Sequence, residues 1–71
     1  MITLGQVGLG YWGPNLLRNF ARLPKARVKT VCDLDEGALA RVRERYPRLG
    51  CTTKAKDLFL DPEIDAVVVT T

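Results

Sequence analysis

The sequence contains no histidine, one tryptophan and only two cysteines. Cys32 and Cys51 are not spaced as C-x-x-C, and no imidazole is present to complete a zinc site. We therefore expect no metal centre and no disulfide, and we interpret both cysteines as buried apolar thiols. The chain also lacks an apolar run of the roughly 18 residues that a membrane span needs, and it lacks a basic and then apolar leader. These absences predict a cytoplasmic protein without membrane contact.

Blocks of like charge are also absent. The net charge of +3 is spread over several segments of a 71-residue chain, which is long enough for one small domain of marginal stability. The densest basic group alternates with apolar and acidic residues, as on an exposed helix face. This alternation favours a solvated face over a nucleic-acid surface. The arginines of this group are Arg41, Arg43, Arg45 and Arg48.

Apolar patterns predict strands at residues 2–8, 27–32, 50–52 and 66–70. Between them, a helix is expected from Tyr11 to about Leu23, with Pro14 in its first turn. A second helix should begin after an Asp35 cap and end before Pro47, and residues 54–60 allow only a turn or two of helix. The inward stripes are Trp12, Leu16, Phe20 and Leu23 on the first helix, and Leu39, Val42 and Tyr46 on the second.

This alternation predicts an α/β fold, a three-layer Rossmann-type parallel sheet with strand order 3-2-1-4. Residues 1–71 would then be the N-terminal portion of a dinucleotide-binding domain, truncated after the fourth strand, without a catalytic or substrate domain. Val67, Val68 and Val69 are apolar, as a strand covered on both faces requires. The open edge of this fourth strand is a candidate surface for self-association.

Three glycines after the first predicted strand match G-x-G-x-x-G. Gly8 permits a sharp turn, Gly10 lets the backbone approach a pyrophosphate, and Gly13 lets the helix lie close to the sheet. The amide protons around Tyr11 and Trp12 and the positive end of the helix dipole favour an anion there. Trp12 either shields the cofactor or packs under the loop as core.

Asp33 follows Gly13 by twenty residues and ends the second predicted strand. A carboxylate at this place accepts hydrogen bonds from the adenosine ribose and repels a 2′-phosphate, which favours NAD over NADP. Its alternative is a capping or turn role shared with Asp35. Leu34 is expected beside the adenine, or in the core. Thr70 and Thr71 either touch the nicotinamide half of the cofactor or only finish their strand.

Three segments are characteristic when taken together: GLGYWGPN (8–15), VCDLD (31–35) and DPEIDAVVV (61–69). With these segments the chain resembles the N-terminal region of the Gfo/Idh/MocA oxidoreductases, the glucose-fructose oxidoreductase and inositol dehydrogenase family. The resemblance implies an NAD-dependent enzyme that oxidises or reduces a hydroxyl of a sugar or sugar nucleotide. It also implies a later Glu-Lys-Pro motif and a large C-terminal domain, neither of which is present here.

These features lead us to expect the NAD-binding portion of an oxidoreductase, with no catalytic residue in the chain and no turnover by the chain alone. Two alternatives stay open at this point. One is a self-associating structural fragment that pairs through its fourth strand. The other is a Rossmann-like binder of a different nucleotide, such as S-adenosylmethionine.

Overall fold

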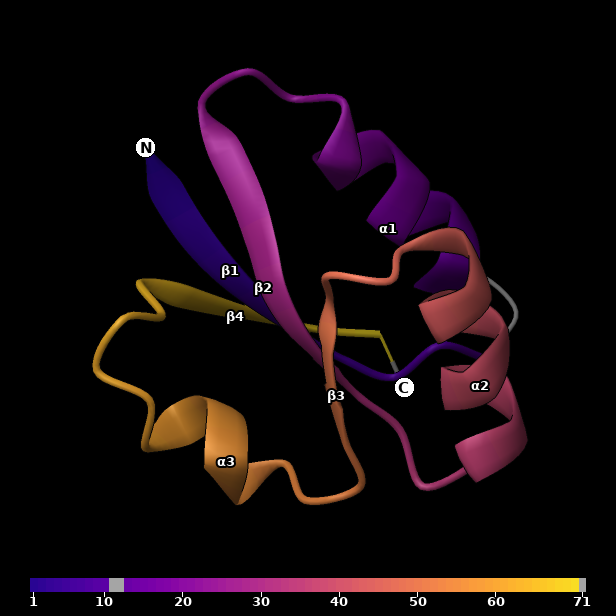
Figure 1. Ribbon diagram of the computed structural model, residues 1–71. Helices are drawn as coiled ribbons and strands as arrows, with labels where there is room; N and C mark the ends of the chain where they lie inside the picture. The colour runs from indigo at the N-terminus through magenta and orange to yellow at the C-terminus, as the bar shows by residue number, and fades with distance from the viewer. Residues whose placement is uncertain (11–12, 71) are drawn as a thin grey trace.

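The computed structural model describes residues 1–10 and 13–70. Its strands form one parallel sheet in the order β3-β2-β1-β4, as predicted. Figure 1 shows α1 and α2 on one side of this sheet and α3 on the other. The fold is therefore the α/β, Rossmann-type arrangement expected from the sequence. The elements are β1 (Ile2–Val7), α1 (Gly13–Ala21), β2 (Ala26–Cys32), α2 (Glu36–Arg45), β3 (Gly50–Thr52), α3 (Lys56–Phe59) and β4 (Ala66–Val69).

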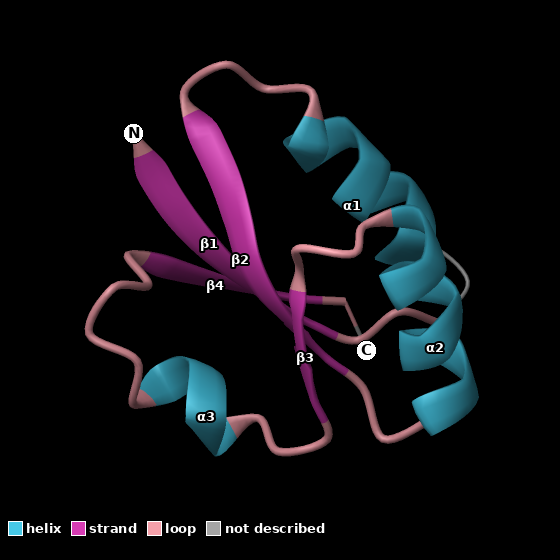
Figure 2. Cartoon of the chain, viewed as in Figure 1, coloured by secondary structure: helices cyan, strands magenta, loops and turns pink. Residues whose placement is uncertain are grey.

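The main core lies between the sheet and the two longer helices, which Figure 2 shows along one side of the strands. Burial of these side chains is the main force that holds the layers together. On the opposite face, Leu58 of α3 is buried and packs over Gly5 of β1. Both faces of β1 are covered in this way. The buried core residues beneath α1 and α2 are Leu9, Leu17, Val31, Leu39 and Val42.

The limits of α2 follow the predicted signals. Asp35 caps the helix, and its carboxylate Oδ1 accepts hydrogen bonds from the backbone N–H groups of Gly37 (2.9 Å) and Ala38 (3.3 Å). Tyr46 forms the C-terminal cap directly before Pro47. The inward stripe is confirmed by the buried side chains of Leu39 and Val42 and the half-buried Tyr46, while the four clustered arginines are exposed.

The inward stripe predicted for α1 is partly wrong. The helix ends at Ala21, and the backbone then closes into a turn in which the Leu23 N–H donates to the Phe20 carbonyl. Leu23 therefore lies beyond the helix with a 49% exposed side chain, and Leu17, which the predicted stripe left out, is buried. The turn precedes Pro24, which disfavours helical geometry in the residue before it.

Coverage of β4 also differs from the prediction. Val67 and Val68 are half-buried, but Val69 is 60% exposed because β4 lies at the edge of the sheet. Within the described part of the chain, β4 pairs only with β1. In the same residues, no helix has the length and apolar character needed to cross a membrane.

Candidate functional site

Gly8 forms a sharp bend directly after β1. Its φ angle is 98°, and no other residue within 1–10 and 13–70 has a positive φ. An L side chain is strained in this conformation, so the bend requires glycine. The Gly8 N–H donates to the Cys32 carbonyl over 2.8 Å, which joins the end of β1 to the end of β2.

Asp33 lies beside this bend at the carboxyl end of β2. Its Oδ2 accepts a 2.7 Å hydrogen bond from the Leu9 N–H, and its Oδ1 accepts a 2.8 Å bond from the Asp35 N–H. The glycine-rich turn and the acidic residue therefore meet on the same side of the molecule. The bond to Asp35 shows that Asp33 also has the turn role that the sequence left as an alternative.

Gly10 occupies open space, in contrast to Gly5 in the core. A Cβ built on Gly10 has no described atom within 4 Å, whereas a Cβ on Gly5 would lie 2.8 Å from Leu58 Cδ2. Gly10 is also exposed. Neither packing nor backbone conformation thus explains this glycine, but close approach of a ligand to the backbone would.

A pocket of about 450 Å³ opens between α1 and α2, and both Gly10 and Asp33 line it. Its walls combine apolar side chains from the core with charged side chains at the rim. The two predicted binding elements therefore border one concave surface. The other residues around it are Leu9, Asn15, Leu17, Arg18, Asp35, Ala38, Arg41, Val42, Arg45 and Tyr46.

Thr70 contacts the bend from the other neighbouring strand. Its Oγ1 donates to the Gly8 carbonyl at 2.7 Å and lies 3.3 Å from the Val7 carbonyl, and its N–H donates to the same Val7 oxygen at 2.8 Å. Gln6, which is fully buried, adds a 3.2 Å bond from Nε2 to the Gly8 carbonyl. Sequence reasoning missed Gln6, although a polar side chain two residues before Gly8 in an apolar strand was a usable signal.

The other predicted site residues are placed as follows. Gly13 begins α1, so the third glycine opens the helix as expected. Leu34 is 87% exposed, so its alternative interpretation as a core residue is wrong. Tyr11, Trp12 and Thr71 lie outside the described residues.

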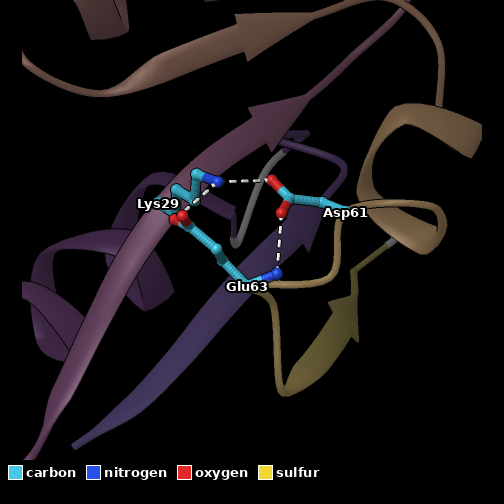
Figure 3. A network of polar contacts seen from close by, with 3 residues as sticks. All are labelled: Lys29, Asp61 and Glu63. Atoms are coloured by element: carbon cyan, nitrogen blue, oxygen red, sulfur yellow. Dashed lines mark hydrogen bonds and ion pairs between the residues drawn. The ribbon is translucent and has the colours of Figure 1, made fainter.

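An ion network that the sequence did not predict holds the loop between α3 and β4 against β2. Lys29 Nζ lies 2.6 Å from Asp61 Oδ2 and 2.9 Å from Glu63 Oε1, and the Glu63 N–H donates to Asp61 Oδ1 (Figure 3). The bond from Lys29, and then that from the Glu63 N–H, lowers the pKa of Asp61. The bonds to Asp61 and Glu63 raise the pKa of Lys29. The network fixes the loop that leads into β4.

Both cysteine thiols are free. Cys32 is buried as predicted, while Cys51 is only half-buried. Burial is the main cause that raises the pKa of Cys32, and the negative charges of Asp33 and Asp57 raise it further. The Cys32 thiol is therefore a packed, protonated group at neutral pH.

Comparison with known proteins gives relatives over nearly the whole chain. An uncharacterised oxidoreductase of Bacillus subtilis, YrbE, is 26% identical over 68 residues, which cover 96% of this chain and 20% of the relative. A protein named glycosyl hydrolase family 109 protein 2, from Shewanella sp. (strain ANA-3), is 28% identical over 79 aligned positions, covering 99% of this chain and 17% of the relative. No protein-family model matches.

The fold has close counterparts among solved structures. The WlbA dehydrogenase of Chromobacterium violaceum, solved in complex with NADH and UDP-GlcNAcA, superposes with a TM-score of 0.84 at 27% identity. The match covers 99% of this chain and 20% of that protein. The chain thus spans about a fifth of the length of the proteins it matches. These likenesses confirm the resemblance predicted from the three matching segments.

Proposed function

We propose that this chain, which has the fold and the sequence likeness of the N-terminal portion of Gfo/Idh/MocA-type dehydrogenases, is the NAD-binding part of an oxidoreductase. The observation that carries the proposal is the meeting of Asp33 with the glycine turn at the Leu9 N–H, 2.7 Å from Asp33 Oδ2. One ligand that spans both features needs an anionic group and, next to it, a group that donates hydrogen bonds. A diphosphate joined to a ribose has this chemistry.

The diphosphate is assigned to the glycine turn. Gly8, Gly10 and Gly13 bring bare backbone toward the start of α1, where unpaired N–H groups and the helix dipole favour an anion. The open space above Gly10 fits this role, since a phosphate oxygen needs room close to the backbone. Tyr11 and Trp12 belong to the same turn by sequence.

The ribose is assigned to Asp33. A carboxylate has about four lone-pair positions, and the bonds from Leu9 and Asp35 use two of them, so acceptor capacity remains for two ribose hydroxyls. Its charge disfavours the 2′-phosphate of NADP. Leu34, with its exposed side chain next to Asp33, supplies an apolar surface for adenine.

Thr70 is assigned to the nicotinamide half of the cofactor, because it follows β4 at the carboxyl edge of the sheet, and Thr71 is assigned to the same role by its place in the sequence. When bound, the nicotinamide supplies hydride exchange with a substrate carbon, which in the proposed parent protein bears a sugar or sugar-nucleotide hydroxyl. We assign no acid or base to this chain. Its residues bind and orient the cofactor, and the rest of the parent protein supplies the substrate site and proton transfer.

The proposal is tested by isothermal titration of the chain with NAD, NADP and S-adenosylmethionine. We expect binding of NAD, weaker binding of NADP, and an Asp33→Ala variant that loses most of the preference between the two. Equal binding of NAD and NADP by the unmodified chain would contradict the role of Asp33. Tighter binding of S-adenosylmethionine than of NAD would favour the other nucleotide class.

A second candidate function is self-association through β4. This strand is an edge strand that contains neither a charged residue nor proline, two features that often protect an edge, and its Val69 side chain is 60% exposed. Two copies pairing through β4 would continue the sheet across a two-fold axis. Light scattering at two protein concentrations tests this: a dimer fraction that rises with concentration supports it, and a monomer at both concentrations excludes it.

A further inference from the structure

We infer that Thr70 and Gln6 are positioning residues that fix the orientation of the peptide group between Gly8 and Leu9, and through it the turn that receives a nucleotide diphosphate. The inference rests on the proposed function for its ligand. The structural basis is that three side chains bond to this one peptide group. Gln6 lies within β1, Asp33 directly follows β2, and Thr70 directly follows β4.

The contacts on this peptide group fall on its two opposite sides. The Gly8 carbonyl accepts from Thr70 Oγ1 at 2.7 Å and from Gln6 Nε2 at 3.2 Å. The Leu9 N–H donates to Asp33 Oδ2 at 2.7 Å. A trans peptide group is planar, with its C=O and N–H directed to opposite sides, so these three bonds hold one rigid group. A flip of this peptide group by 180° would break all three bonds together.

We call the three hydrogen bonds from Thr70, Gln6 and Asp33 the peptide clamp, and the conformational freedom of Gly8 explains why it is needed. With φ at 98° and no Cβ, this residue can take several backbone conformations at similar energy, so its own sterics do not choose one. Tertiary hydrogen bonds must make the choice. Thr70 is suited to this role because its N–H and Oγ1 both bond to the backbone at the end of β1, which leaves the hydroxyl little freedom.

The consequence for ligand binding concerns the diphosphate more than the adenosine. The clamped peptide group directly precedes Leu9 and Gly10, so its orientation sets the direction in which the next N–H groups of the turn point. Bound anions depend on N–H groups that are already aimed at them. Within residues 1–10 and 13–70, Asp33 accepts from the Leu9 and Asp35 N–H groups, and Thr70 bonds only to the Val7 and Gly8 carbonyls, so loss of the Thr70 hydroxyl should leave the ribose acceptor in place.

The test uses the isotope-labelled chain, with ADP as a diphosphate probe and adenosine as a probe without phosphate. For Thr70→Val we expect ADP binding to weaken by about three- to tenfold, the value of one hydrogen bond, with adenosine binding unchanged and the Leu9 amide resonance shifted. Thr70→Ser keeps the hydroxyl and should restore both. Thr30→Val removes a half-buried hydroxyl from the middle of β2 and serves as the matched control.

Two results would overturn the inference: a Leu9 amide resonance that does not move in Thr70→Val, or equal weakening of ADP and adenosine. If Thr70→Val does not fold, the unmodified chain still decides, because a clamped Leu9 N–H must show scalar coupling to the Asp33 carboxyl carbon and slow solvent exchange. Absence of both contradicts the clamp. If the unmodified chain shows the coupling but binds neither ADP nor NAD, the clamp stands and the proposed function fails.

Discussion

Asp65 and Thr3 exchange two hydrogen bonds across the start of β1 and the residue before β4. The Asp65 N–H donates to the Thr3 carbonyl, and the Thr3 N–H donates to Asp65 Oδ2, both at 2.8 Å. The side chain of Asp65 thus imitates a strand carbonyl one position before the ladder begins at Ala66. This contact sets the register that pairs Val69 with Val7 and brings the next residue, Thr70, beside Gly8. The acidic lead-in to β4 therefore helps to position the turn.

Removing this side chain should destabilise the fold. Asp65→Ala deletes the acceptor for the Thr3 N–H, and we expect the free energy of unfolding to fall by about 1 kcal/mol, since the bond is partly exposed to water. Asp65→Asn keeps a side-chain oxygen at the same place and should lose less. Urea unfolding followed by circular dichroism measures both. Equal losses in the two variants would show that charge, and not the accepted hydrogen bond, is what matters.

The Lys29 network predicts a dependence of stability on acid pH. Because its partners lower the pKa of Asp61, the stability contributed by this carboxylate is complete above its ordinary pKa of 3.8 and is lost as pH falls through the lower folded value. We expect the stability difference between the wild type and Asp61→Asn to be largest near neutral pH and to shrink in acid. Thermal melts across this range measure it.

Glu44→Gln, which likewise replaces a carboxylate by an amide but on the exposed face of α2, is the control for this experiment. A stability difference between wild type and Asp61→Asn that is the same at pH values on both sides of 3.8 would rule out this ion network as a contributor.

At alkaline pH, Lys29 determines the outcome. Because its pKa is raised, the stability that Lys29 contributes is complete below pH 10.5 and is lost as pH rises through the folded value.

The two thiols should react at different rates. Cys51 is half-buried, whereas Cys32 is 4% exposed and its pKa is raised by burial, so both access and thiolate content are low at Cys32. We expect iodoacetamide at neutral pH to label Cys51 first, as read by peptide mass spectrometry. Both thiols should react in guanidinium. Labelling of Cys32 before Cys51 in the folded chain would contradict the burial of β2.

Gly8→Ala should destabilise the chain by about 1–2 kcal/mol, the cost of placing an L residue at positive φ. The loss should appear in the absence of any ligand, as a lower urea midpoint with an unchanged slope. An unaltered midpoint would mean that the bend can relax to a different conformation. The change is therefore read together with the Leu9 amide resonance, which reports the orientation of the neighbouring peptide group.

Much of the fold could be predicted from the sequence because local signals and burial agree. The Asp35 cap, Pro47 and the apolar runs each act over a few residues, and they fix α2 and the strands within one or two positions. The strand order follows from the doubly wound arrangement that alternating strands and helices, together with the glycine motif, indicate. The meeting of Asp33 with the glycine turn follows in turn, since both lie at the carboxyl ends of neighbouring strands.

The rest depends on contacts between residues distant in sequence. Nothing near Lys29 indicates that its partners are Asp61 and Glu63, more than thirty residues later. The exposure of Leu23 depends on where the helix ends and the turn before β2 begins, which the apolar spacing does not show. The role of Thr70 required the β1–β4 register, which spacing alone does not provide.

The central claim is that bare backbone in the glycine turn binds a diphosphate, and Gly10→Ala tests it most directly. Gly10 does not have a positive φ and the space around it is open, so alanine should leave the melting temperature unchanged or slightly higher. A methyl group there should nevertheless weaken NAD binding by about tenfold or more, because it occupies the approach to the backbone. A Gly10→Ala chain that folds and binds NAD as tightly as the wild type would contradict the account.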